Sequence, residues 1–158
     1  MQSLTTNSNF RRSILMLSSL ALIASLGAFS AQEKTRPMIA VIPKGTTHEF
    51  WKTVHAGALK GASESGVDIL WKGPAREDDR DDQIKVVESS VSRKVQGIVI
   101  APLDEKALVP SLKEAATAKI PVVVFDSGIK WDGRSSFVAT DNQRGGMLAA
   151  EEMGRILA

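Results

Sequence analysis

Two short segments combine residue types that could hold a polyhydroxylated ligand. In the first, His48 stands just before the aromatic pair Phe50 and Trp51. An aromatic face can stack on the apolar C–H surface of a sugar ring, and an imidazole can donate or accept a hydrogen bond. In the second, Asp126 directly follows an apolar run, and its carboxylate could accept hydrogen bonds from two adjacent hydroxyl groups. Together these side chains indicate chemistry suited to a neutral sugar or polyol.

The same residues also have ordinary structural interpretations. Trp51 and Val54 recur at helical spacing, which favours a core position for Trp51 and leaves the role of Phe50 open. Asp126 begins the tripeptide Asp-Ser-Gly, which is good turn chemistry by itself. The sequence therefore leaves open whether Asp126 is a turn residue or a ligand-binding carboxylate.

Catalytic and metal-binding patterns find little support in the sequence. It contains no G-x-S-x-G elbow, no H-E-x-x-H motif and no P-loop, and it has no cysteine. The acidic run from Glu77 to Asp82 lacks the glycine and terminal glutamate of a calcium loop, and its carboxylates suit the N-terminal end of a helix dipole. His48 and His55 have no evident third metal ligand. We therefore expect no enzyme activity, no bound metal and no cofactor.

Short apolar runs alternate with amphipathic helical patterns along the chain. Such runs are typical of parallel strands that are buried on both faces, and they lie at residues 38–42, 67–71, 97–101, 120–125 and 136–140. Helical spacing marks the segments between them and a last segment that runs to the end of the chain. This alternation predicts an α/β fold with a parallel sheet covered by helices on both faces, for which we expect the strand order 2-1-3-4-5.

The predicted fold determines where a ligand would bind. Open parallel sheets bind ligands beyond the carboxyl ends of their strands, so His48, Asp126 and the pair Asp141-Asn142 belong to the loops of interest. Thr46 and Glu49 have the spacing of a capping box at the start of the first helix, and Gly66 is placed to end that helix. Asp141 is well placed as the N-cap of the last helix.

The N-terminal segment has the pattern of an export signal. Arg11 and Arg12 precede an apolar run over residues 14–29, and the small residues around it predict cleavage after Ser30. The run is shorter than a comfortable membrane span, which favours export over anchoring. Loss of Arg11 and Arg12 leaves 18 basic and 18 acidic residues, so the net charge falls to zero and gives no reason to expect nucleic-acid binding. We expect a periplasmic protein without a membrane anchor.

Five segments in the same order resemble the ribose-binding-protein-like family of periplasmic sugar-binding proteins. They are residues 39–44 with the aromatic pair after them, 82–88, 97–104, 120–126 and 138–146. The resemblance implies two α/β lobes that are joined by a three-strand hinge and close on one monosaccharide. It also implies delivery of that sugar to the permease subunits of an ABC importer.

The resemblance also implies roles for individual residues. Phe50 and Trp51 would be the stacking aromatics, His48 and Lys44 would be contacts from the first loop, and Asp126 would be the hydroxyl-binding carboxylate. Ser127 is a departure, because ribose-binding members of the family have an arginine there, and this leaves the identity of the sugar open. Asp141 and Asn142 would lie at the first hinge.

The sequence also predicts how the chain is organised. We expect a signal peptide over residues 1–30, an N-terminal ligand-binding lobe over 31–140, and a hinge with the start of the remaining protein over 141–158. The last helical pattern ends without a glycine cap or a polar tail, which suggests a chain cut short before the second lobe. We expect a monomer. Two other interpretations share this fold: a sugar-sensing module for a membrane receptor kinase, and the effector domain of a LacI-type regulator.

Overall fold

Five short parallel strands form the centre of the structure, which is a computed structural model that describes residues 35–158. The strands are β1 (Met38–Ile42), β2 (Asp68–Trp71), β3 (Gly97–Ile100), β4 (Val122–Phe125) and β5 (Ser136–Val138). Their order in the sheet is β2-β1-β3-β4-β5, and every neighbouring pair is parallel. The predicted fold class and strand order are both confirmed.

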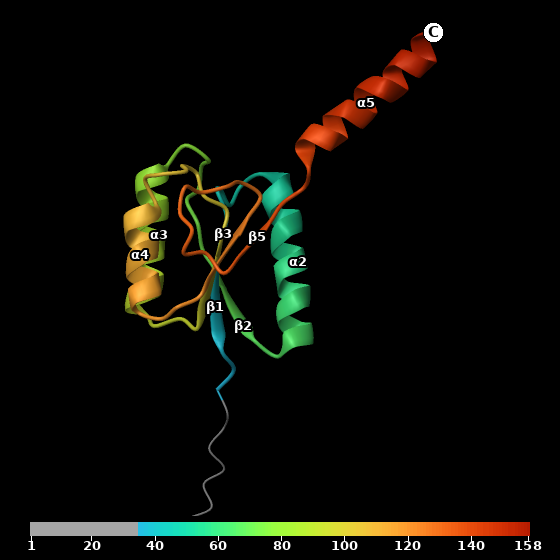
Figure 1. Cartoon of the computed structure of the whole chain (residues 1–158). Coiled ribbons are helices and arrows are strands. Elements are labelled where there is room, and N and C mark those ends of the chain that lie inside the picture. Colours follow the sequence, from blue (N-terminus) through green and yellow to red (C-terminus); the bar gives the residue numbers. More distant parts are fainter. Residues whose placement is uncertain (1–34) are drawn as a thin grey trace, which may run out of the picture. The chain divides into compact units, whose positions relative to one another are not determined.

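The helices follow the predicted alternation. They are α2 (Glu49–Ser65), α3 (Arg80–Ser92), α4 (Val109–Thr117) and α5 (Asn142–Leu157). Figure 1 shows α3 and α4 on one face of the sheet and α2 on the other. Because each strand is followed by a connection that returns to the same end of the sheet, all the carboxyl ends meet along one edge. The loops singled out in the sequence leave from that edge.

The core lies between the sheet and the pair α3 and α4. Side chains alternate between the two faces of a strand, so Ile98 and Ile100 of β3 point into this layer and are buried, while Val99 between them is half-buried. Leu112 of α4 and Leu108, the residue just before that helix, belong to the same cluster and have no exposed surface. A Leu112→Ala change would leave a cavity here and cost about 2–5 kcal/mol of folding free energy.

Of the two predicted ends of α2, the start is wrong and the end is confirmed. The capping box at Thr46 and Glu49 does not form, because α2 begins at Glu49 and its N-cap is therefore His48, whose Nδ1 accepts a hydrogen bond from the Phe50 amide at 3.2 Å. The Thr46 hydroxyl instead donates to the carbonyl of Pro74 at 3.2 Å. Gly66 ends the helix as predicted, in the left-handed conformation with φ 68°.

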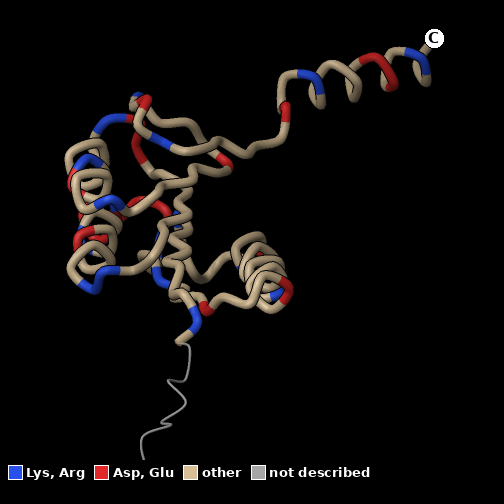
Figure 2. The backbone as a smooth tube through the Cα atoms, turned by 60° about the horizontal axis from the view of Figure 1, so that its bottom comes forward, with Lys and Arg blue, Asp and Glu red and all other residues tan. Residues whose placement is uncertain are grey.

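The last helix lies outside this packing. Every residue of α5 is exposed, including Met147, Leu148 and Met153. No helix within residues 35–158 is long and apolar enough to cross a membrane. Figure 2 shows acidic and basic residues interspersed along this part of the backbone. The predicted signal peptide and its cleavage after Ser30 lie outside the described residues.

Candidate ligand-binding site

Asp126 stands at the carboxyl end of β4 in an unusual backbone conformation. Its φ is 63°, a left-handed value that few residues with a side chain adopt without a local reason. Its amide donates to the carbonyl of Val138 at 3.0 Å, which ties it to the end of β5. The amide of Ser127 donates back to the carbonyl of Phe125 at 2.7 Å, so the chain turns sharply just after the strand. Asp126 is thus a turn residue whose carboxylate lies at the carboxyl ends of the strands, where open parallel sheets in general bind ligands.

Lys44 reaches this carboxylate from the first loop. The Lys44 Nζ lies 2.7 Å from the Asp126 Oδ2, and it also donates to the Oγ of Ser127. The Ser127 hydroxyl donates to the same Asp126 Oδ2 at 3.0 Å. We call these three side chains the Lys44–Asp126–Ser127 cluster. It joins the loops that follow β1 and β4, two strands that are separated in the sheet by β3.

A cavity of about 430 Å³ lies beside this cluster. Its lining comes from α2, from the ends of β4 and β5 with the loops after them, and from the start of α5. The apolar lining residues are Phe50, Val54, Phe125, Val138 and Ala139, and the polar ones are Asp126, Thr140 and Asn142. Phe50 is 50% exposed and so presents a free aromatic surface. An aromatic ring and a carboxylate in one cavity offer both an apolar face and a hydrogen-bond acceptor, which is the kind of lining that small-molecule sites have.

The two aromatics of the first helix have different positions. Trp51 is only 2% exposed, which agrees with the core interpretation of its spacing. Its indole Nε1 donates to the Glu77 Oε1 at 2.7 Å, and its ring meets Phe50 edge-on with centroids 4.8 Å apart. Such edge-to-face contacts are favourable and orient both rings. In the described structure Trp51 therefore packs against Phe50 and has almost no exposed surface of its own.

The remaining candidate residues lie at helix starts. His48 is exposed at the N-cap of α2, and its Nδ1 accepts a hydrogen bond from the Phe50 amide. Asp141 caps α5 as predicted, since its carboxylate accepts from the Arg144 amide at 2.9 Å. Asn142 is the first residue of α5 and lines the cavity. The hinge role of Asp141 and Asn142 stays a prediction.

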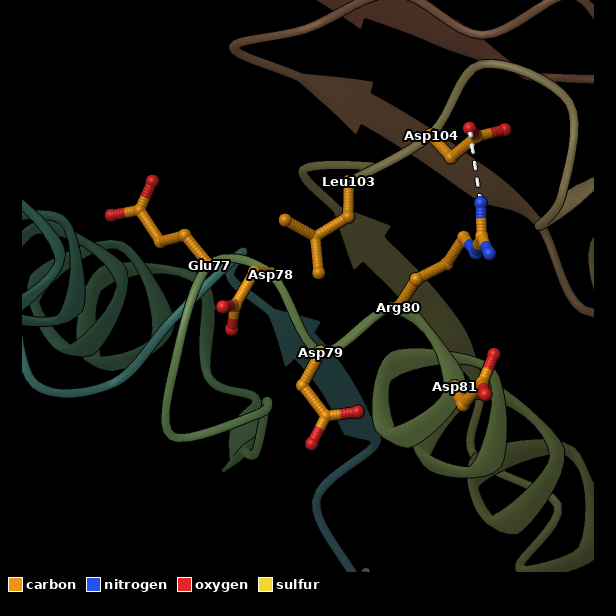
Figure 3. A pocket seen from close by; sticks show the side chains of 7 residues that line it. All are labelled: Glu77, Asp78, Asp79, Arg80, Asp81, Leu103 and Asp104. Atoms are coloured by element: carbon orange, nitrogen blue, oxygen red, sulfur yellow. Dashed lines mark ion pairs between the residues drawn. The ribbon is translucent and has the colours of Figure 1, made fainter.

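The acidic run forms a separate hollow of about 340 Å³ at the start of α3, which Figure 3 shows from close by. Asp79 caps the helix by accepting from the Asp82 amide at 2.9 Å. Arg80 lies 3.7 Å from Asp104, and the two side chains reach toward each other in Figure 3. The carboxylates therefore serve a helix cap and an ion pair, as predicted for a solvated helix start.

Asp104 is the carboxylate of this hollow that is held by backbone amides of the loop before α4. It accepts hydrogen bonds from the backbone amides of Ala107 at 2.7 Å and Lys106 at 2.8 Å. These two bonds, followed by the charge of Arg80, lower the pKa of the Asp104 carboxyl below its ordinary value. Its role is to fix the loop between β3 and α4.

Gln83 has a positioning role that sequence reasoning missed. It is fully buried on α3, and its amide nitrogen donates to the carbonyls of Pro43 at 3.0 Å and Ala101 at 2.8 Å. Its amide oxygen accepts from the Leu103 backbone at 2.9 Å. One side chain thus connects the ends of β1 and β3 next to Lys44. The only signal in the sequence is an uncharged polar residue directly after the acidic run.

Comparison with known proteins identifies the wider group. Residues 39–158 match the periplasmic binding protein domain. The D-ribose/D-allose-binding protein of Pseudomonas aeruginosa is 31% identical over 90% of this chain and 47% of its own length. The ribose import binding protein of Escherichia coli is 25% identical over 93% of this chain and 48% of its own length. The chain spans about half the length of the curated relatives that it matches.

Solved structures agree with this assignment. A carbohydrate transporter solute-binding protein of Agrobacterium radiobacter in complex with D-arabinose superposes with a TM-score of 0.69 and 37% identity, covering 75% of this chain and 40% of that one. An ABC transporter solute-binding protein of Actinobacillus succinogenes with bound D-allose gives a TM-score of 0.72 and 26% identity, covering 78% and 45%. The chain belongs to the periplasmic binding protein domain family.

Proposed function

We propose that this chain is the N-terminal lobe of an exported solute-binding protein that captures a monosaccharide or related polyol for an ABC-type importer. The observation that carries the proposal is the cavity in which the Asp126 carboxylate and the exposed ring of Phe50 lie together. The names of the relatives support it, because they are sugar-binding proteins. Their greater length supports the view that a second lobe completes the site.

The described contacts suggest how a sugar would be held. Among residues 35–158 the Asp126 Oδ1 accepts no hydrogen bond, so it is free for a ligand hydroxyl. Phe50 would cover the apolar C–H face of the ring, with Trp51 behind it and His48 at the rim. Lys44 and Ser127 would contact the ligand beside Asp126. The protein performs no bond chemistry in this proposal, and its work is binding alone.

Closure would complete the capture. One lobe leaves a ligand largely solvated, because about half of the enclosing surface is missing. We propose that residues 31–140 are the first lobe and that Asp141 and Asn142 are the hinge from which residues 141–158 lead into the second. A second lobe closing over Phe50 and Asp126 would exclude water and strengthen each hydrogen bond.

Export is the second part of the proposal. Residues 1–30 would be a cleaved signal peptide, and the mature protein would be a periplasmic monomer without an anchor that meets the importer's permease subunits. Fractionation of cells that produce the full chain tests this. Mature protein that begins after Ser30 in the periplasmic fraction supports the proposal, and uncleaved protein in the cytoplasm contradicts it.

Low-affinity calorimetry of the full chain with a panel of pentoses, hexoses and polyols tests the binding itself. The panel must reach high concentrations, because an open lobe binds weakly. Saturable heat with D-ribose, D-allose or D-arabinose supports the proposal. A folded chain that gives no saturable heat with any member of the panel contradicts it.

A further inference from the structure

Asp132 and Gly133 form an exposed turn in the loop that joins β4 to β5. The side chain of Asp132 is fully exposed, and its ion pair with Arg134 spans 3.6 Å. The sequence contains no other Asp-Gly pair and no Asn-Gly pair. A glycine after an aspartate matters chemically, because no side chain hinders a reaction between the glycine backbone nitrogen and the aspartate carboxyl.

Backbone hydrogen bonds hold the loop on both sides of this turn but not within it. Before the turn, the Lys130 amide donates to the carbonyl of Glu105 at 2.8 Å. After the turn, the Ser135 amide donates to the carbonyl of Val122 at 2.7 Å. Within the part of the chain that the structure describes, the amides of residues 131–134 donate to no acceptor. The backbone nitrogens of the turn can therefore move without breaking a hydrogen bond.

The ring of Trp131 covers one side of Gly133. A Cβ built on Gly133 would lie 2.3 Å from the Cζ2 atom of that ring, so the ring rests directly on the glycine. Trp131 also packs against the hydrophobic core, and its carbonyl accepts a hydrogen bond from the Arg134 guanidinium at 2.5 Å. The ring thus occupies the place of a side chain on Gly133, while the carboxyl of Asp132 stays in the solvent.

We propose that Asp132–Gly133 is a site of spontaneous covalent modification, at which the aspartate converts to isoaspartate and thereby loosens β5. In the first step the Gly133 nitrogen attacks Cγ of the protonated Asp132 carboxyl. A bond between that nitrogen and Cγ forms, and the carboxyl hydroxyl leaves with the amide proton as water, which gives a cyclic succinimide. In the second step water opens the ring. Cleavage of the bond to Cγ restores aspartate, and cleavage of the bond to the Asp132 main-chain carbonyl carbon gives isoaspartate. Nothing is oxidised or reduced, and the reaction needs no enzyme.

The product lengthens the chain between two fixed points. Isoaspartate routes the main chain through Cβ and Cγ, which adds one carbon atom between Lys130 and Ser135. β5 begins directly after Ser135, all three of its residues are exposed, and it lies at the edge of the sheet. It therefore yields more readily than its neighbour β4, which packs on the core. The hydrogen bond from the Asp126 amide to the Val138 carbonyl joins these two strands, so it reports whether β5 has moved.

The test is incubation of the folded full chain, followed by proteolysis and mass spectrometry with electron-transfer fragmentation, which distinguishes isoaspartate from aspartate. Isoaspartate at position 132 should accumulate to at least about tenfold the level at any other aspartate. A species lighter by one water should precede it, and hydrolysis in isotopically labelled water should introduce one labelled oxygen. In the peptide that spans residues 126 and 132, whose two isomers separate by chromatography, the Asp126 amide should exchange its hydrogen about tenfold faster in the isoaspartate form.

Asp132→Glu is the matched control. Glutamate keeps the charge at this exposed position, but its longer side chain would have to close a larger ring, which forms far more slowly. The variant should show no modification at position 132. Gly133→Ala is unsuitable, because its Cβ would displace the Trp131 ring. Asp78 controls for exposure alone, since it is exposed but is followed by Asp79, and it should stay unmodified.

The same chain incubated in urea isolates the effect of the fold. Asp132 in the folded chain should isomerise within about tenfold of its rate in the unfolded chain, because the fold leaves the amides of the turn without partners. Isoaspartate that forms at position 132 only in urea overturns the inference. Equal exchange of the Asp126 amide in the two isomers overturns it as well. The proposed function stands in either case, since the reaction involves no sugar.

Discussion

A Gln83→Met change tests how the fold positions the first-loop residues. Gln83 is fully buried, and it supplies two donors to Pro43 and Ala101 and one acceptor to Leu103. Methionine fills a similar volume but makes none of these hydrogen bonds. The change therefore leaves two buried carbonyls and a half-buried amide without their partner.

The magnitude follows from these three groups. A buried polar group that loses its partner costs about 1–3 kcal/mol, and the lower end applies to Leu103 because water can reach it in part. Burial of the apolar methionine side chain offsets part of this loss of folding free energy. We expect the free energy of unfolding to fall by about 3 kcal/mol. With an m-value of about 2 kcal/mol/M in urea, the unfolding midpoint should drop by about 1.5 M.

Urea unfolding of the full chain, followed by circular dichroism, measures this midpoint. Ser90→Ala is the matched control, since Ser90 is equally buried on the same helix but its hydroxyl donates only to the Val86 carbonyl within that helix. Loss of the Ser90 hydroxyl leaves no distant group without a hydrogen-bond partner, so the unfolding midpoint should move by less than about 0.5 M. Equal midpoints for Gln83→Met and the wild type would refute the view that Gln83 holds the strand ends together.

Three further predictions concern separate features. Gly66→Ala should lower the free energy of unfolding in urea by about 1 kcal/mol, because Gly66 is in the left-handed conformation. Gly57→Ala, inside the helix that Gly66 ends, should instead raise it by about 0.5–1 kcal/mol. The same sign for both variants would contradict this account. Phe50→Ala should weaken D-allose binding about fivefold or more in calorimetry while leaving the urea midpoint nearly unchanged, and Leu59→Ala, at an equally exposed position of α2, should leave binding unaltered. The pKa of the Asp104 carboxyl, measured by NMR titration of its carboxyl carbon, should lie below the ordinary value of an aspartate. The contribution of Asp104 to stability is then fully present at pH values above the ordinary pKa and is lost as the pH falls through the lowered pKa. An unshifted titration would refute the role of the backbone hydrogen bonds to Asp104.

The sequence was sufficient for the strands and several helix ends, whereas the expected sheet order came from the habit of this fold class and not from any residue. Apolar runs such as residues 97–101 are dictated by burial on both faces, and Gly66 and Asp141 follow from local cap chemistry. Part of the acidic run was also interpreted correctly, because Asp79, Asp81 and Asp82 lie at the N-terminal end of α3. Where a single turn or a single strand determines the structure, sequence pattern is a good guide.

The contacts that build the site were beyond the sequence. Lys44 and Asp126 lie in loops that follow different strands, and nothing in the spacing of either residue indicates that they pair. The bonds from Trp51 to Glu77 and from Gln83 to Pro43 likewise join segments that are far apart in the chain. The capping box failed for a related reason, since the Thr46 hydroxyl found the carbonyl of Pro74 and α2 began later than expected. Tertiary partners decide such cases.

The location of the ligand is the central claim of this account. Amide chemical shifts of the ¹⁵N-labelled full chain, recorded while D-allose is added, test it most directly. We predict saturable shifts that centre on Phe50, Asp126 and Ser127, together with the indole N–H of Trp51 behind Phe50. Shifts confined to the acidic hollow around Asp79 and Asp104, or no shifts in a folded chain, would contradict it.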